Sequence, residues 1–243
     1  MIKNRPGMRL TNAFDLFGKS YAVVRRNLNV YALVYAIPAA MMIAGTIQLI
    51  DNSQRDVWNW GNTFSSSVWG PNVGSDSSVE TASTILAIVL FFGAIISYFL
   101  AIILNLRAAQ GKTVTFSTVW SELWRNGLWF KLIGLALMTI LILIVGFILL
   151  IIPGVILLWR LYLAPYILVD KQTTSMDALS ISWNMTKGYA WPIYSIILFS
   201  VVLSLPSITP IVGGLISFVL GVAYAAAPAL RYQEIKKPPS LLQ

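Results

Sequence analysis

The chain has 243 residues, of which 57% are hydrophobic and only 11% are charged, and its mean hydropathy is +0.75. This composition excludes an ordinary soluble domain, in which roughly a quarter of the residues are charged, and it favours a protein with a lipid-facing surface. The net charge is +8, and the sequence contains neither Cys nor His. Disulfides, thiolate metal sites, and the commonest general base and metal ligand are therefore excluded, and we expect no metal and no cofactor.

Six apolar segments are predicted to cross a membrane as helices. A spanning helix needs roughly 20 apolar residues, and the alternation of a β-barrel is absent. Proline and glycine at Pro153 and Gly154, and the prolines Pro206 and Pro210, divide the two longest apolar runs. We predict a single all-α integral membrane domain over 1–243, with three hairpins built from the spans 29–50, 82–107, 128–151, 154–169, 191–206 and 210–230.

The basic residues predict the orientation of these spans. Fifteen of the 17 Lys and Arg residues lie in the segments 1–28, 107–131, 170–190 and 231–243. Because Lys and Arg collect in cytoplasmic loops, we expect both termini in the cytoplasm, with 231–243 as a tail and 51–80 as an external loop. The basic charge then indicates topology and contact with anionic lipid, and not a nucleic-acid partner.

The predicted external loop is rich in aromatic residues, notably Trp58, Trp60 and Trp69. Tryptophan is enriched where a protein crosses the membrane–water interface, so these side chains are expected to anchor the loop there. The alternative is a patch that binds a partner protein.

A short amphipathic stretch precedes each predicted hairpin. Each stretch opens with a hydroxyl residue that can cap a helix, repeats apolar residues at steps of three or four, and ends with a basic, Asn or Gly cluster. The stretches run from Thr11 to Tyr31, from Thr115 to Trp129 and from Ser175 to Trp191. We therefore predict three copies of a cytoplasmic interfacial helix followed by a hairpin, although amphipathic connectors in any membrane protein would look similar.

Small residues recur every four positions in three of the spans. Such a stripe lets two helix backbones approach closely, which is a main source of helix association in lipid. Packing within the chain is the favoured interpretation, and a pore or a homo-oligomer interface is the alternative. The residues concerned are Ala36 and Ala40, then Gly93, Ser97 and Ala101, and finally Gly213, Ser217, Gly221 and Ala225.

Few polar residues are candidates for a site. Arg160 lies inside the fourth span with no carboxylate in any span to neutralise it, which makes it a candidate contact for an anion or lipid phosphate. The alternative is that Arg160 donates to carbonyls freed at the Pro153 break. On the cytoplasmic side the densest polar group comprises Asp170, Asp177, Asn184, Thr186 and Lys187, but nothing in their spacing predicts catalysis.

One motif is rejected. Gly111-Lys112-Thr113 matches the end of a phosphate-binding loop, yet Leu106 stands where the first glycine is required, and the segment leaves a membrane helix instead of a strand.

Several segments between residues 105 and 190 share a recognisable pattern. They are Leu106-Arg107-Ala108-Ala109-Gln110-Gly111-Lys112, Ile152-Pro153-Gly154, Leu158-Trp159-Arg160-Leu161-Tyr162-Leu163-Ala164-Pro165-Tyr166, Val169-Asp170, Ala178-Leu179-Ser180-Ile181-Ser182-Trp183 and Thr186-Lys187-Gly188. This pattern resembles the membrane domain attached to some glycerophosphoryl diester phosphodiesterases and its stand-alone, YciC-like relatives. The resemblance implies a multi-span helical fold in a prokaryotic plasma membrane. It does not imply phosphodiesterase activity, because that hydrolase domain depends on His and carboxylates.

The sequence therefore favours a protein that is not an enzyme. The leading hypothesis is a scaffold or accessory subunit that organises membrane lipids or other membrane proteins. The alternative is a small transporter or channel for an anionic or lipid-like substrate that uses Arg160. An intramembrane enzyme ranks last, because only isolated hydroxyls are available at membrane depth.

Overall fold

The computed structural model describes residues 10–55, 77–209 and 212–236, and every regular element over these residues is a helix. The predicted all-helical fold is thus confirmed. In chain order the helices are α1 (Ala13–Arg26), α2 (Leu28–Arg55), α3 (Ser77–Ala109), α4 (Phe116–Trp124), the 3-10 helix η1 (Arg125–Gly127), α5 (Leu128–Leu149), α6 (Ile151–Leu161), α7 (Ala164–Lys171), α8 (Ser175–Met185), α9 (Ala190–Ser204), the 3-10 helix η2 (Leu205–Ile208), α10 (Val212–Tyr224) and α11 (Ala227–Lys236).

Within the described residues, five helical segments are long and apolar enough to cross a membrane, and a sixth is obtained if α1 and the first part of α2, which meet at 97°, count as one bent span. Their outer faces are apolar: Ile148 is 78% exposed and Ile152 is 73% exposed. So many exposed apolar side chains on long helices are favourable only when lipid surrounds them, so the chain is a multi-pass membrane protein. The five segments are Ile85–Ala109, Phe116–Leu149, Ile151–Lys171, Ala190–Ile208 and Val212–Lys236.

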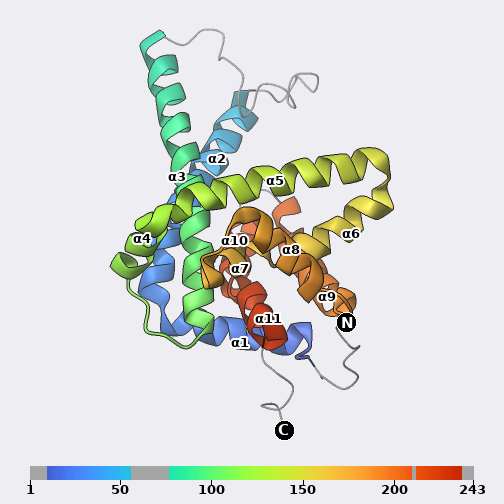
Figure 1. Cartoon of the computed structure of the whole chain (residues 1–243). Coiled ribbons are helices and arrows are strands. Elements are labelled where there is room, and N and C mark those ends of the chain that lie inside the picture. The colour runs from blue at the N-terminus through green and yellow to red at the C-terminus, as the bar shows by residue number, and fades with distance from the viewer. Residues whose placement is uncertain (1–9, 56–76, 210–211, 237–243) are drawn as a thin grey trace.

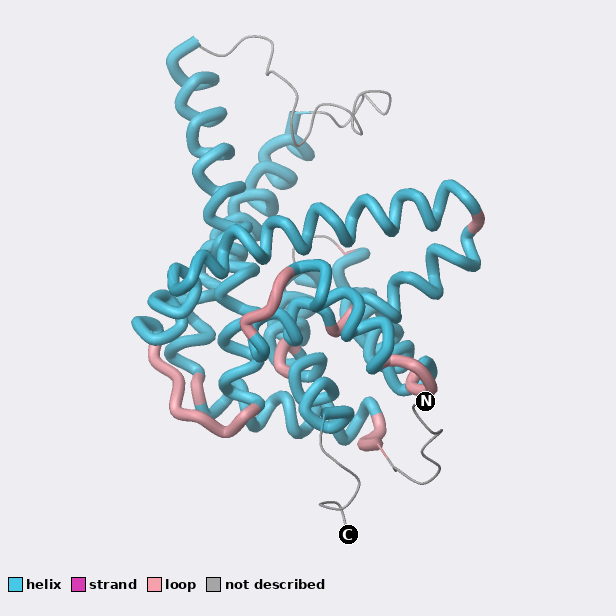
Figure 2. Tube along the Cα trace, in the orientation of Figure 1, coloured by secondary structure: helices cyan, strands magenta, loops and turns pink. Residues whose placement is uncertain are grey.

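Two arms diverge from a common centre (Figure 1). One arm contains α2 and the N-terminal half of α3, and it projects toward the top of the view. The other contains α5 and α6 and projects to the right. The centre holds the C-terminal half of α3 together with α7 and α11 (Figure 1), and helices make up most of the described trace, with loops only at the turns between them (Figure 2).

Helix boundaries differ from the sequence prediction at three places. The chain turns between α5 and α6 at the extended residue Leu150, and Pro153 lies in the first turn of α6, where its missing N–H costs nothing. A second break after Leu161 separates α6 from α7, within the predicted fourth span. The predicted loop 51–80 is helical up to Arg55 and again from Ser77, and Trp58, Trp60 and Trp69 lie outside the described residues.

The predicted tail 231–243 is also partly helical, because its first six residues continue α11. Arg231 is only 1% exposed. It donates to the carbonyl of Thr11 (2.8 Å) and pairs with Glu234 (2.8 Å), and Glu234 also accepts a hydrogen bond from the Thr11 hydroxyl. A buried cation needs such partners, so the end of α11 is an internal element that holds the start of α1.

Short helices precede α2, α5 and α9 along the chain. Thr174, and not the adjacent Ser175, caps α8 by accepting a hydrogen bond from the N–H of Asp177 (3.2 Å). Between α4 and α5 the chain turns through two consecutive left-handed residues, Asn126 (φ 55°) and Gly127 (φ 64°). Asparagine and glycine are the residues that adopt this conformation most easily, so the sequence itself sets the turn.

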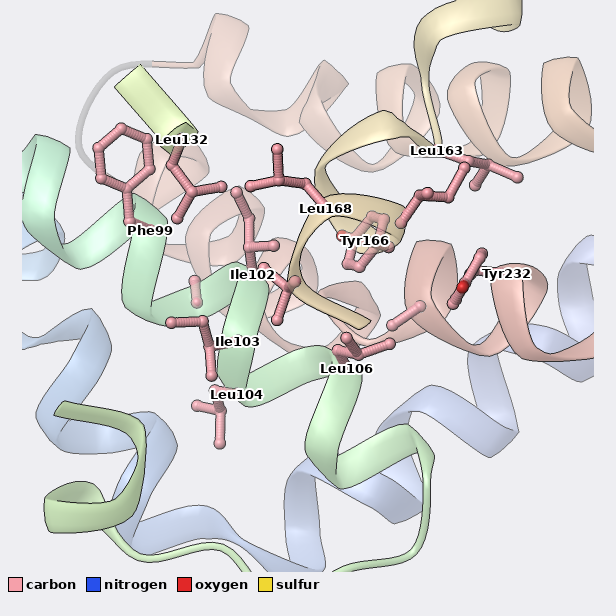
Figure 3. Packing of buried hydrophobic residues seen from close by; sticks show 14 of the residues in the cluster. Phe99, Ile102, Ile103, Leu104, Leu106, Leu132, Leu163, Tyr166, Leu168 and Tyr232 are labelled. Carbon is pink, nitrogen blue, oxygen red and sulfur yellow. The ribbon is translucent and has the colours of Figure 1, made fainter. Parts of the chain in front are cut away.

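The buried core lies where α3, α7 and α11 meet. Figure 3 shows side chains from these three helices packed together. The fully buried residues include Ile103 and Leu104 of α3, Leu168 of α7 and Tyr232 of α11. Residues farther out along the arms are mostly exposed, so the protein packs tightly at its centre and presents apolar helices around it.

Candidate functional site

Arg107 begins a chain of polar contacts at the C-terminal end of α3. Its Nε donates to both carboxylate oxygens of Glu122 on α4 (3.1 and 3.0 Å), and its Nη1 donates to Gln110 (3.1 Å). Both charged side chains are about four-fifths buried. A two-pronged contact between guanidinium and carboxylate is directional as well as strong, so it fixes α4 against α3.

Asp170 on α7 continues this chain of contacts. Gln110 donates to its Oδ1 (3.0 Å), the hydroxyl of Tyr232 donates to its Oδ2 (2.6 Å), and the ammonium of Lys236 pairs with the same oxygen. Both oxygens of this carboxylate are therefore occupied. We call these six residues, Arg107, Gln110, Glu122, Asp170, Tyr232 and Lys236, the Asp170 network.

The polar group that the sequence places around Asp170 does not converge on one point. Asp177 accepts hydrogen bonds from the hydroxyls of Thr174 (2.6 Å) and Thr173 (3.2 Å), and these bonds lower the pKa of its carboxyl. Asn184 donates to the carbonyl of Ser180 within its own helix (3.0 Å). Lys187 is exposed beyond the end of α8. Asp177 and Asn184 thus bond to neighbours in their own segment, and none of the three side chains lines the cleft or the cavity described below.

Arg160 lies between two tryptophan rings near the end of α6. Its guanidinium carbon is 4.3 Å from the ring centre of Trp159 and 5.0 Å from that of Trp183, and Nη1 donates to the carbonyl of Trp183 (3.0 Å). In return, the hydroxyls of Ser182 (2.7 Å) and Thr186 (3.4 Å) donate to the carbonyl of Arg160. The break between α6 and α7 frees such carbonyls, and α8 satisfies this one.

Replacing Arg160 with Met is expected to lower the free energy of unfolding by about 1–2 kcal/mol, because two cation–π contacts and one hydrogen bond are lost. Equilibrium unfolding in detergent micelles, followed by circular dichroism, measures the change. Lys187→Met is the matched control, since it removes an exposed cation nearby. Equal stabilities of the two variants would contradict a structural role for Arg160.

The small-residue stripe on α3 faces α2. A Cβ on Gly93 would lie 3.1 Å from the side chain of Ile37, and the Ser97 hydroxyl donates to the carbonyl of Val34. Ala101 is buried. Ala36 and Ala40, in contrast, lie on the exposed face of α2, because Tyr31 and Val34 occupy the face that packs.

The stripe on α10 is divided among different surroundings. Gly213 lies directly against the carbonyl of Pro206, and the Ser217 hydroxyl donates to the carbonyl of Ser204 (3.3 Å). Gly221 has open space around it. Ala225 lies at the C-terminal end of α10 and lines a cavity described below.

A basic cleft of about 1080 Å³ lies beside α4. Gly111 adopts a left-handed conformation (φ 75°) just after the end of α3, and residues of the loop that follows it form one wall of the cleft. Lys112 and Thr113 lie on this wall, and Arg125 and Trp124 lie on the side of α4. The side chains of Lys112 and Arg125 are exposed, whereas Arg107 in the same cleft is neutralised by Glu122.

An aromatic row borders the basic cleft. Phe116, Trp120 and Trp124 are four residues apart on α4, which places them on one face of the helix. Their ring centres are 6.1 and 5.8 Å apart, and Trp129 continues the row at 5.3 Å from Trp124. Trp124 is 46% exposed, so the row presents aromatic surface next to the two cations.

The basic cleft was missed in the sequence. Lys112 attracted attention only through a phosphate-loop motif, which remains rejected because the segment follows a helix. The sequence pattern that indicates this cleft is a row of aromatic residues at four-residue spacing, with a basic residue on each side of the row. A scan against protein-family models and searches of curated proteins and of solved structures find no match for this chain.

Proposed function

We propose that this membrane protein acts without catalysis, as a scaffold that binds anionic lipid headgroups in the basic cleft and thereby organises lipid or a partner membrane protein. The observation that carries the proposal is the pairing of Lys112 and Arg125 with the exposed aromatic row of α4. Lipid phosphates are recognised by Lys and Arg, and tryptophan favours the depth at which those phosphates lie.

The charge balance of the cleft supports an anionic ligand. Glu122 is the carboxylate among its lining residues, and Arg107 already pairs with it. Lys112 and Arg125 are left to attract a phosphate. A guanidinium contacts a phosphate through two parallel N–H groups, and an ammonium adds a compact charge. The cleft therefore suits a headgroup with one or two phosphates.

The proposal includes an orientation in the membrane. We place α1, α4 and α8 in the cytoplasmic interface of a prokaryotic plasma membrane, each leading into a hairpin, with both termini in the cytoplasm. The 97° angle between α1 and α2 supports this placement, as does the exposure of aromatic residues such as Phe14 (76%) and Trp191 (80%). Membership of the YciC-like family is part of the same proposal.

The double variant Lys112→Ala/Arg125→Ala is expected to bind anionic lipid roughly 10- to 30-fold more weakly, because each cation near a lipid surface contributes about 1 kcal/mol. Native mass spectrometry of the detergent-solubilised protein, titrated with dioleoylphosphatidylglycerol, measures the apparent affinity. Dioleoylphosphatidylcholine serves as the lipid control.

Lys187→Ala is the protein control for this experiment. It removes an exposed basic residue that lies outside the cleft. An equal loss of affinity in Lys187→Ala would show that diffuse basic charge, and not the cleft, holds the lipid. Unchanged affinity in the double variant would likewise remove the support for the proposal.

Transport through Arg160 is not adopted as a second function. Its guanidinium is engaged by Trp159 and Trp183, and Arg160 is not among the residues that line the basic cleft or the cavity described next.

A further inference from the structure

A second cavity, of about 390 Å³, lies where the two arms diverge. Four tyrosines from different helices border it: Tyr35 of α2, Tyr98 of α3, Tyr162 after the end of α6, and Tyr166 of α7. Thr139 and Leu143 of α5 and apolar residues of α6 form further parts of its walls. We call it the tyrosine cavity. Its volume lies within the range of small-molecule sites.

Three of the four tyrosine hydroxyls that border this cavity make no hydrogen bond to a described residue. Tyr166 is 8% exposed, yet its hydroxyl has no hydrogen-bond partner among the described residues. The same holds for the hydroxyls of Tyr98 and Tyr162 over the described part of the chain. These three tyrosines line the cavity, where a ligand or water can supply the bonds that their hydroxyls lack.

Asn105 and Tyr31 form a hydrogen-bonded pair of polar side chains at the cavity. Asn105, which is 4% exposed, also lines the cavity. Its side-chain oxygen accepts a hydrogen bond from the buried hydroxyl of Tyr31 (2.7 Å). This bond holds the amide in place, and Asn105 adds a polar group to the cavity wall.

The ligand must be uncharged. Among the described residues that line the tyrosine cavity, none carries a charge. A phosphate or ammonium group would lose its hydration there without gaining a counter-ion, and this loss costs several kcal/mol. Hydroxyl and amide groups can instead bond to the carbonyl or hydroxyl oxygens of a neutral molecule.

The ligand must also reach the cavity from the bilayer. Tyr98 is 60% exposed although it lies within the apolar segment Ile85–Ala109, so one edge of the cavity opens on the lipid-facing surface. We propose that the tyrosine cavity binds a neutral membrane amphiphile whose head carries carbonyl or hydroxyl oxygens, with Tyr166 as a donor to that head. Acylglycerols and quinones share this chemistry.

Three short-chain probes test the proposal on the full chain in detergent micelles, with apparent affinity measured by native mass spectrometry. They are dioctanoylglycerol, decyl-benzoquinone and dioctanoylphosphatidic acid. We expect at least one of the two neutral probes to bind, and the one that binds identifies the source of the ligand. Tyr166→Phe, which removes only the hydroxyl oxygen, is expected to weaken that binding about tenfold, equivalent to one buried hydrogen bond.

Tyr224→Phe is the matched control, because Tyr224 is also a buried tyrosine whose hydroxyl has no partner among the described residues, but it is not among the residues that line the cavity. It is expected to leave the affinity unchanged. The proposal is overturned if neither neutral probe binds, if Tyr166→Phe binds as tightly as the wild type, or if Tyr166→Phe weakens dioctanoylphosphatidic acid to the same degree. Thermal unfolding of each variant confirms that it is folded, and Tyr162→Phe replaces Tyr166→Phe if the latter is not.

Discussion

Asp170→Ala is expected to lower the free energy of unfolding by about 3 kcal/mol, because the variant leaves several groups of the Asp170 network without their acceptor. Tyr232 is fully buried, so its hydroxyl would lose its bond with no access to water. Gln110 would lose the hydrogen bond that it donates to the other carboxylate oxygen of Asp170. An orphaned buried polar group costs about 1–3 kcal/mol, and removing one member of a buried ion pair about 3–5 kcal/mol. We expect a loss of stability near the lower end of the second range, because Lys236 is 46% exposed and water can solvate its charge when Asp170 is removed.

Two control variants separate the contribution of the buried hydrogen bonds from that of the ion pair. Lys236→Ala removes a half-exposed cation and is expected to cost at most about 1 kcal/mol. Asp170→Asn keeps an acceptor for Tyr232 and is expected to fall between the two. Equilibrium unfolding in detergent micelles gives all three values. If Asp170→Ala and Lys236→Ala destabilised the protein equally, the network would amount to one surface ion pair.

Gly213→Ala is expected to destabilise the protein by about 2–3 kcal/mol. A Cβ at this position would overlap the carbonyl oxygen of Pro206 and the hydroxyl of Thr209, both of which lie in the turn between α9 and α10. A backbone carbonyl cannot swing aside as a flexible side chain can, so the turn itself would have to move. Thermal unfolding monitored by tryptophan fluorescence, together with circular dichroism, measures the loss.

Gly221→Ala is the matched control in the same helix. A Cβ there meets no atom within 4 Å, and alanine favours a helix over glycine by up to about 1 kcal/mol. We therefore expect this variant to be as stable as the wild type or slightly more stable. The two glycines belong to one sequence stripe, so similar effects at both positions would contradict the close contact at Gly213.

Polar contacts hold the centre of this protein together. Helices in lipid gain little from apolar burial, so close packing and hydrogen bonds must supply much of the association energy. Arg231, with its bonds to Thr11 and Glu234, joins the start of α1 to α11. The Asp170 network joins α3, α4, α7 and α11. Both sets lie in segments that hydropathy assigns to loops, tails or span ends.

The class of the protein and much of its local structure follow from the amino-acid sequence alone. Long apolar runs predict helices because every backbone polar group in lipid must be paired within its own segment. Local chemistry likewise predicts the turn at Asn126-Gly127, where two left-handed residues are required. These properties depend on neighbours along the chain, so a single sequence is sufficient to predict them.

The contacts between distant residues become known only from the packed helices. Asp170 and Lys236 are 66 positions apart, and no periodicity connects them. Hydropathy misassigned 231–236 to a tail because Arg231 and Glu234 look solvent-exposed until their partners are known. Lys112 and Arg125 border one cleft only because the loop after Gly111 lies beside α4. The four tyrosines share a cavity only because the two arms diverge there. Helix rotation and inter-helix distance set such contacts, and both depend on the packing of the whole chain.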